Sequence, residues 1–327
     1  MTDASARAPL TAPSLGDVES ARGRLRGVAT RTPLVRLNLP DSSAEVWLKL
    51  ECLQPIGSFK LRGAFNAMSR AGRERIAGGV YTASAGNMAQ GLAWSARRMG
   101  VPCRVVVPET APAVKLAAIE RLGGTYVKAP FARWWQTLVE HSYPGIDGHF
   151  VHPVSDPDVI AGNATIGLEI VEDVPDVSAV VVPFGGGGLS CGIAAAVRAL
   201  RPGVPVYAAE VETAAPLAAS LAARAPASVE YVPSFVDGIG GRSVLAEMWP
   251  LASTILAGSL VVSLKETAAA LKLLAERNRV IAEGAGAVAV AAALSGRAGG
   301  GKVVCVVSGG NIDSSKLCTI LKGEIPG

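Results

Sequence analysis

The feature that most constrains the fold is a regular alternation between apolar runs of strand length and alanine-rich runs of helical length. The expected strand and helix pairs are 46–50 with 63–70, 79–83 with 89–99, 103–108 with 114–122, 179–184 with 189–200, 204–210 with 214–223 and 261–264 with 266–278, before a last strand at 302–308. Parallel strands buried on both faces are continuously apolar and need helical crossovers. The pattern therefore predicts an α/β protein with mostly parallel strands in more than one sheet.

Composition excludes several other classes of protein. With 50% hydrophobic and 18% charged residues, the chain of 327 residues is far from the composition of disordered proteins. No apolar stretch reaches the roughly 18 residues that a membrane-spanning helix needs, because the best candidate covers only 285–294. A formal charge of +4, without a basic run, does not indicate nucleic-acid binding. We therefore expect a small-molecule partner, with no nucleic acid and no membrane.

The amino terminus and the cysteines favour the cytoplasm. Residues 1–17 lack the apolar core of a signal peptide, so we expect a flexible lead-in. The five cysteines form no CxxC pair, which predicts buried thiols rather than disulfides or a metal site.

Lys60 is the first candidate for chemistry. It follows a strand and a Pro55–Gly57 turn and falls in the first turn of an expected helix. An ammonium is unfavourable at the positive end of a helix dipole, so its pKa should be lowered and its amine made nucleophilic. This position makes Lys60 a candidate for Schiff-base formation, although a solvent-exposed lysine on an amphipathic helix fits the same spacing.

A run of four glycines at 185–188 lies between an expected strand and an expected helix. Backbone amides in such a loop can converge on an anion, and the helix amino terminus adds partial positive charge, so a phosphate fits. A dinucleotide site is the alternative, with Glu210 as the ribose partner. That fingerprint fails at its third glycine, where this chain has Ser190.

Two further segments follow strands. Residues 82–91 carry hydroxyl, amide and backbone donors that could hold a carboxylate, although a helix cap explains them equally well. Ser308 follows the last apolar strand, at the carboxyl end of a parallel sheet, which is the usual place for ligands. A simple turn is the alternative for Ser308.

Taken together and in this order, these segments resemble the fold-type II pyridoxal-phosphate (PLP) enzymes, specifically the threonine/serine dehydratase and serine racemase group. The resemblance also includes residues 31–34, 107–108, 111–112, 152–153, 160–162 and 283–287. It implies two α/β domains of mostly parallel sheets, with the cofactor pyridoxal 5'-phosphate in the cleft between them. The large domain would comprise residues 1–66 and 157–327, and the small inserted domain residues 67–156. A homodimer is also implied.

The resemblance assigns roles residue by residue. Lys60 matches the lysine that forms the Schiff base, and is the predicted catalytic residue. The predicted cofactor-binding residues are Lys60, Phe59, Asn87, Gly185, Gly186, Gly187, Gly188, Gly238, Glu283 and Ser308. The predicted substrate-binding residues are Ser84, Ala85, Gly86, Asn87 and Met88.

The implied reaction is β-elimination, in which a β-hydroxy amino acid such as threonine or serine loses its hydroxyl and amino groups to give a 2-oxo acid and ammonia. Racemases of the group carry a serine where this chain has Ala85, so efficient racemisation is not expected. Amino-acid racemisation and β-replacement remain the alternatives. Met88 replaces a histidine common in the family.

Some relatives bind a divalent cation at positions that match Glu210 and Pro216. Proline offers no side-chain oxygen to a hard cation, so we predict no metal site. Trp134, Trp135 and Arg242 are left open as contacts to an aromatic or acidic substrate.

Overall fold

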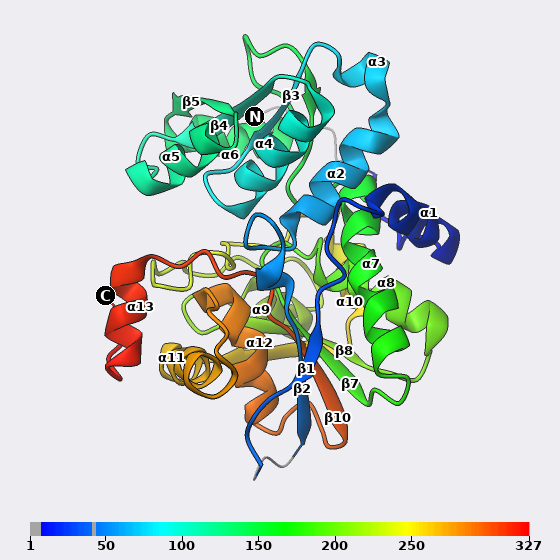
Figure 1. Cartoon of the computed structure of the whole chain (residues 1–327), viewed down its shortest axis with the longest axis vertical. Coiled ribbons are helices and arrows are strands. Elements are labelled where there is room, and N and C mark those ends of the chain that lie inside the picture. The colour runs from blue at the N-terminus through cyan, green and yellow to red at the C-terminus, as the bar shows by residue number, and fades with distance from the viewer. Residues whose placement is uncertain (1–7, 41–43, 327) are drawn as a thin grey trace.

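The computed structural model describes residues 8–40 and 44–326, and its strands form two sheets of six and four strands (Figure 1). The strands are β1 (Leu34–Arg36), β2 (Glu45–Lys49), β3 (Val80–Ala83), β4 (Cys103–Pro108), β5 (Thr125–Ala129), β6 (His149–Phe150), β7 (Ala179–Pro183), β8 (Val206–Val211), β9 (Gly258–Val262) and β10 (Lys302–Val306). The α/β architecture with mostly parallel strands is the one that the sequence predicts.

Helices connect most of these strands. They are α1 (Leu15–Leu25), α2 (Lys60–Ala71), α3 (Arg73–Ile76), α4 (Asn87–Met99), α5 (Ala113–Arg121), α6 (Phe131–Glu140), α7 (Pro157–Asp173), α8 (Ser190–Leu200), α9 (Pro216–Ala223), α10 (Trp249–Ile255), α11 (Leu264–Leu273), α12 (Gly284–Leu294) and α13 (Ser314–Leu321), with a 3₁₀ turn at η1 (Glu51–Leu53) and a π turn at η2 (Leu274–Asn278).

The larger sheet has the strand order β1-β2-β10-β7-β8-β9, in which only the β1–β2 pair is antiparallel. Its central strands are buried on both faces. Val303 and Cys305 pack with α11 and α12, whereas Val304 and Val306 pack with α7, α8 and α10. The alternation of side chains along a strand explains why one apolar run serves two cores.

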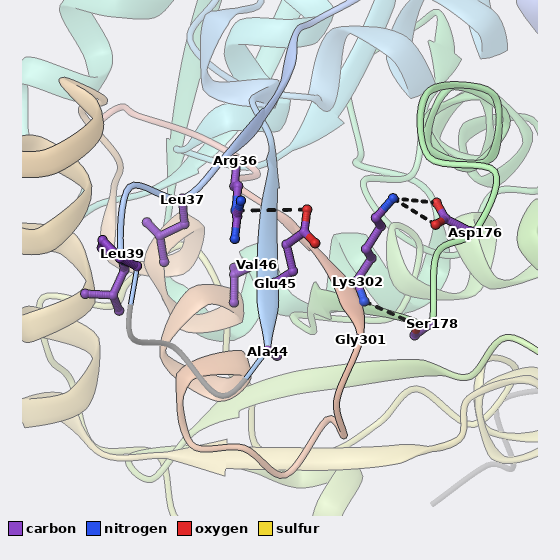
Figure 2. A pocket seen from close by; sticks show the side chains of 11 residues that line it. Arg36, Leu37, Leu39, Ala44, Glu45, Val46, Asp176, Ser178, Gly301 and Lys302 are labelled. Atoms are coloured by element: carbon purple, nitrogen blue, oxygen red, sulfur yellow. Dashed lines mark hydrogen bonds and ion pairs between the residues drawn. The ribbon is translucent and has the colours of Figure 1, made fainter.

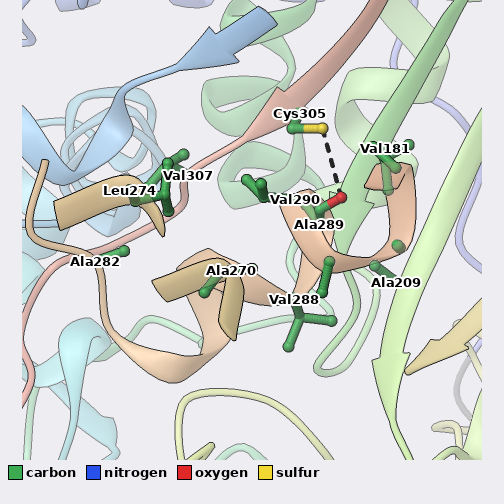
Figure 3. Packing of buried hydrophobic residues seen from close by; sticks show 14 of the residues in the cluster. Val181, Ala209, Ala270, Leu274, Ala282, Val288, Ala289, Val290, Cys305 and Val307 are labelled. Atoms are coloured by element: carbon green, nitrogen blue, oxygen red, sulfur yellow. Dashed lines mark hydrogen bonds between the residues drawn. The ribbon is translucent and has the colours of Figure 1, made fainter. Parts of the chain in front are cut away.

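Helix α12 occupies the centre of the first of these cores. Figure 3 shows Val288, Ala289 and Val290 of this helix among side chains of β7, β8, β10 and α11, and Cys305 Sγ donates to the Ala289 carbonyl at 3.4 Å. Small alanine side chains let the helix lie close to the sheet. No helix in the described part of the chain is long and apolar enough to cross a membrane.

The smaller sheet has the order β5-β4-β3-β6, and all its pairs are parallel. Helices α2, α4 and α5 cover one face through a cluster that includes Val105 and Leu92, and α6 covers the other through Tyr81 and Val106. The carboxyl ends of β3 and β4 in this sheet, and of β7 and β10 in the larger sheet, lead to the candidate site described below.

The predicted domain boundaries fall at two helices. Residues 66 and 67 lie inside α2, where Ala64 and Met68 pack into the core of the smaller sheet. Residue 157 is the first residue of α7, which Asp156 caps by accepting from the amides of Asp158 and Val159. The division into a large and a small domain at these residues stays a prediction.

The expectation of a flexible lead-in at residues 1–17 is wrong for residues 8–17, which the structure describes. Residues 1–7 lie outside the described residues. The Leu10 amide donates to the Glu247 carbonyl at 2.9 Å, and α1 begins at Leu15. Ser14 and Asp17 form a reciprocal capping box, a helix-start signal that the interpretation of residues 1–17 as a flexible lead-in overlooked.

Candidate active site

A cavity of about 380 Å³ lies where the two sheets face each other, and every predicted site residue lines it. These residues are Phe59, Lys60, Ser84, Ala85, Gly86, Asn87, Met88, Gly185, Gly186, Gly187, Gly188, Gly238, Glu283 and Ser308. The segments 84–88, 185–188 and 308 follow β3, β7 and β10 respectively. Carboxyl ends of parallel strands converge at such a position, which is why segments far apart in sequence meet here.

Lys60 opens α2, and its Nζ donates to the Pro153 carbonyl at 2.8 Å. The same Nζ lies 5.2 Å from the centre of the Phe59 ring. Burial lowers the pKa of Lys60 to about 8, against an opposing effect of the Glu283 carboxylate. The lowered pKa of Lys60 agrees with the expectation from the sequence, but its main cause is burial and not the helix dipole. About a tenth of the amine is therefore unprotonated at pH 7, far more than for an ordinary lysine.

The four glycines form a tight loop ahead of α8, which has no side-chain cap. A Cβ at Gly186 would lie 2.6 Å from Val154 Cγ1, and one at Gly188 would lie 2.8 Å from the Val154 carbonyl oxygen. The backbone amides of residues 185–188 make no hydrogen bond to another described residue. The loop thus presents free donors to the cavity, a suitable arrangement for an anion such as a phosphate.

A second set of free donors lies at the start of α4. Gly86 is its N-cap without a side-chain cap, and the amides of Ala85, Asn87 and Met88 donate to no residue in the described ranges. The Met88 side chain is buried in the core of the smaller sheet. The backbone here could hold a carboxylate, and replacing histidine with Met88 leaves those amides in place.

Asn87 connects this segment to the larger sheet. Its Nδ2 donates to Glu283 Oε1 at 2.8 Å, and its Oδ1 accepts from Asn311 Nδ2 at 2.8 Å. Burial raises the pKa of Glu283 to about 7, and the neighbouring Asp237 adds to the rise. Glu283 therefore holds the Asn87 amide in a fixed orientation, with one Nδ2 hydrogen left for a further acceptor.

Two other predicted residues border the same space. The Ser308 hydroxyl makes no hydrogen bond to any described residue, while its carbonyl accepts from the Phe59 amide at 3.1 Å. A Cβ at Gly238 would lie 2.9 Å from the Ala285 Cβ, so only glycine lets this loop pass so close to α12. Ser308 thus offers a free neutral hydroxyl at the cavity wall.

The sequence interpretation assigned no role to two charged groups in the cavity. Lys115 of α5 and Asp237 form an ion pair of 3.1 Å between the smaller-sheet side and the loop before Gly238. The two residues are far apart in the chain, and no local pattern in the sequence shows that they meet. Of the residues left open, Trp134 lines the cavity, whereas Trp135 and the exposed Arg242 do not.

Glu210, considered from the sequence as a ribose partner or a cation ligand, caps a helix instead. Its carboxylate accepts from the amides of Leu217 and Ala218, at 2.9 and 2.8 Å, and from the Ser259 hydroxyl at 2.6 Å. It caps the start of α9 and is buried, so a dinucleotide ribose has no access to it. Within the described ranges no cluster of three or more histidine, cysteine or acidic side chains could hold a metal ion.

A larger cavity, of about 500 Å³, lies at the opposite ends of the strands (Figure 2). Glu45 and Lys302, the first residues of β2 and β10, line it, and none of the predicted site residues does. Its charges pair locally, since Lys302 lies 2.8 Å from Asp176 and Arg36 lies 4.0 Å from Glu45. Size alone does not identify the functional cavity, because ligands of parallel sheets bind at the carboxyl ends of strands.

The cavity between the sheets can therefore bind two anionic groups, and the same cavity contains the Lys60 amine, whose pKa is lowered. This donor set fits pyridoxal phosphate: residues 185–188 for the phosphate, Ser308 and Asn87 for the polar atoms of the ring, and Lys60 for the aldehyde. The fit rests on the unpartnered amides and on the free Ser308 hydroxyl.

Comparison with known proteins points the same way. A family model described as pyridoxal-phosphate dependent enzyme matches residues 25–309. The L-threonine ammonia-lyase of Thermotoga maritima is 38% identical over 318 residues, which cover 94% of this chain and 78% of that protein. Threonine deaminase isoform 2 from Solanum lycopersicum superimposes with a TM-score of 0.85 at 31% identity, covering 98% of this chain and 91% of the other. Maize serine racemase gives a TM-score of 0.83 at 29% identity, covering 96% and 98%.

Proposed function

The chain belongs to the family of pyridoxal-phosphate dependent enzymes, and on this premise we propose that it is an ammonia-lyase acting on a β-hydroxy amino acid. The substrate, such as threonine or serine, loses its hydroxyl and amino groups and leaves as a 2-oxo acid and ammonia. The observation that carries the proposal is the meeting of Lys60, with its lowered pKa, and two sets of free amides in one cavity.

Each part of the cavity has a distinct task in this reaction. Bound pyridoxal phosphate supplies the electron sink that stabilises a carbanion at the substrate Cα. Lys60, as the unprotonated amine, takes the proton from that Cα. The amides of Ala85, Asn87 and Met88 hold the substrate carboxylate, which fixes the Cα–H bond relative to Lys60.

Ser308 and Glu283 tune the site. The Ser308 hydroxyl can share a hydrogen bond with a ring nitrogen, but it does not hold a proton there as a carboxylate does. A weaker electron sink favours prompt loss of the β-hydroxyl over reactions that need a long-lived carbanion. Glu283 fixes the Asn87 amide through their 2.8 Å hydrogen bond.

Racemisation is the second candidate, because the chain also superimposes on maize serine racemase. A racemase needs a second group that returns a proton to the other face of Cα. The resemblance places that group at Ala85, whose methyl side chain can neither donate nor accept a proton. We therefore place racemisation below elimination.

The proposal is tested with the PLP-loaded enzyme and L-serine, D-serine and L-threonine. We expect equal amounts of 2-oxo acid and ammonia, unchanged chirality of the remaining substrate, and no turnover by Lys60→Ala. If the remaining substrate changes chirality and no 2-oxo acid is released, the enzyme is a racemase and the proposed elimination is wrong. Full turnover by Lys60→Ala would refute the role of Lys60.

The assembly and location that we propose are a homodimer in the cytoplasm. All five cysteines are free, four of them buried and Cys318 exposed, as expected in a reducing compartment. Exposed apolar side chains of the larger-sheet part, including Leu53 and Ile281, are available for a subunit contact. Light scattering should give twice the chain mass, and a monomer would contradict the dimer.

A further inference from the structure

Helix α6 contributes an apolar wall to the active-site cavity. Trp134 and Leu138 both line the cavity, and their spacing of four residues places them on one face of the helix. They pack against a cluster that contains Tyr81, Ala83 and Val106 on the underlying sheet. The smaller sheet therefore supports this wall. The proposed carboxylate site at 84–88 follows directly after β3 of the same sheet.

The indole of Trp134 is not what packing alone would select at this position. Its Nε1 is buried and has no hydrogen-bond partner among the described residues. A buried donor without an acceptor costs stability, whereas a phenylalanine would fill similar space without that cost. Packing within the protein therefore does not explain why this position has a tryptophan. Because the ring lies in the cavity wall, contact with a ligand is the explanation that we infer.

The charges in the cavity argue against a second carboxylate on the substrate. Besides Lys60, the cation that lines the cavity in the described residues is Lys115, and it is already paired with Asp237 at 3.1 Å. Arg242, considered from the sequence as a partner for such a carboxylate, is exposed and outside the cavity lining. A hydroxyaspartate would therefore bring in a charge without a free partner.

We propose that Trp134 and Leu138 form a subsite for an apolar group on the substrate β-carbon. The preferred substrates would then be β-hydroxy amino acids with an aromatic or large aliphatic side chain, such as phenylserine, rather than serine. This inference rests on the proposed elimination reaction and adds the class of substrate to it. Contact between the two side chains and a phenyl ring excludes water from apolar surface on both partners.

The test compares three variants on two substrates. Trp134→Ala removes the wall, Trp134→Phe keeps an apolar ring, and Trp135→Ala is the matched control, since Trp135 is the next residue but does not line the cavity. We expect the ratio of kcat/KM for phenylserine to that for serine to exceed about 10 in the unmodified enzyme. Trp134→Ala should lower this ratio about 10- to 100-fold, and Trp134→Phe, which keeps a smaller ring, should lower it less than Trp134→Ala does. Trp135→Ala should stay within about threefold of the unmodified enzyme.

A binding measurement gives a readout independent of turnover. L-phenylalanine and L-alanine lack the β-hydroxyl and are not eliminated, so calorimetry reports their affinity alone. Trp134→Ala should weaken L-phenylalanine by about tenfold or more and leave L-alanine unchanged. If Trp134→Ala does not fold, Leu138→Ala is measured in its place, with the same direction expected.

The outcomes separate this inference from the proposed function. A preference for serine over phenylserine, or an equal loss on both substrates in Trp134→Ala, would overturn the subsite while the elimination stands. Release of no oxo acid from either substrate would overturn the elimination itself. Retained selective binding of L-phenylalanine would still support the subsite in that case.

Discussion

Replacing Arg62 by methionine should be among the most destabilising single changes in the chain. Arg62 lies two residues after Lys60 in α2, and its side chain is 2% exposed. The guanidinium makes bonds of 2.9 Å to Glu51, and of 2.7 and 3.0 Å to Glu169. Burial alone would raise the pKa of Glu51, but Arg62, together with Thr32 and Lys49, more than offsets this and lowers it.

The magnitude follows from what the substitution leaves behind. Arg62→Met removes the ion pair of the buried Glu51 carboxylate. Glu169 is still paired with Lys49, at 2.6 Å. Breaking a buried ion pair from one side costs about 3–5 kcal/mol. At roughly 2–4 °C per kcal/mol for a large domain, the Tm should fall by roughly 6–20 °C.

Calorimetry and circular dichroism of the apoenzyme measure this change, and Arg70→Met is the matched control. Arg70 is in the same helix, but its side chain is 52% exposed and 3.9 Å from Asp158, so its loss should cost less than about 1 kcal/mol. A Tm of Arg62→Met within about 2 °C of the unmodified protein would refute the reasoning.

The pH dependence of this deficit has a defined sign. In the unmodified protein the pKa of Glu51 is lowered, so its contribution is present above the unfolded value and is lost as the pH falls through the folded value. Without Arg62, burial raises that pKa instead, and the carboxylate destabilises increasingly as the pH rises. The Tm deficit of Arg62→Met should therefore be larger at pH 8 than at pH 5.

The other predictions concern the cofactor site. Gly188→Ala puts a Cβ 2.8 Å from the Val154 carbonyl oxygen and should weaken pyridoxal-phosphate retention about tenfold or more, read from absorbance after dialysis. Gly203→Ala, in open space, is the control, and equal retention by both variants would contradict the expectation. Uptake of the cofactor by apoenzyme should rise with pH around a midpoint of about 8, because the unprotonated Lys60 is the reactive form. Glu283→Gln removes the carboxylate that raises the pKa of Lys60, so the pH midpoint of cofactor uptake should be lower in this variant. A midpoint near 10 in the unmodified protein would contradict the argument that burial lowers the pKa of Lys60.

The parts of the site that sequence reasoning located share one local pattern. Ser84, Gly185 and Ser308 each follow an apolar strand, so the parallel topology alone predicts that they lie at one edge of their sheets. The strand pattern can be recognised from the chain without any knowledge of long-range contacts. That is why the fold and most of the cavity lining could be predicted.

The rest depends on contacts that no local pattern encodes. Lys115 and Asp237 are 122 residues apart and meet only because α5 packs across the cavity. Glu210 resembled a ligand group because its strand ends beside a glycine-rich crossover, yet its oxygens cap the helix that starts at Pro216. The position of Trp134 in the cavity wall likewise follows from how α6 lies on the smaller sheet.

The most direct test of the central claim is to identify the lysine that carries the cofactor. The PLP-loaded enzyme is reduced with borohydride, which fixes the cofactor on the lysine that holds it, and is then digested and mapped by mass spectrometry. The account predicts the pyridoxyl group on the peptide that contains Lys60, and none in Lys60→Ala. Labelling of another lysine of the cavity, such as Lys115, at the same yield would contradict it.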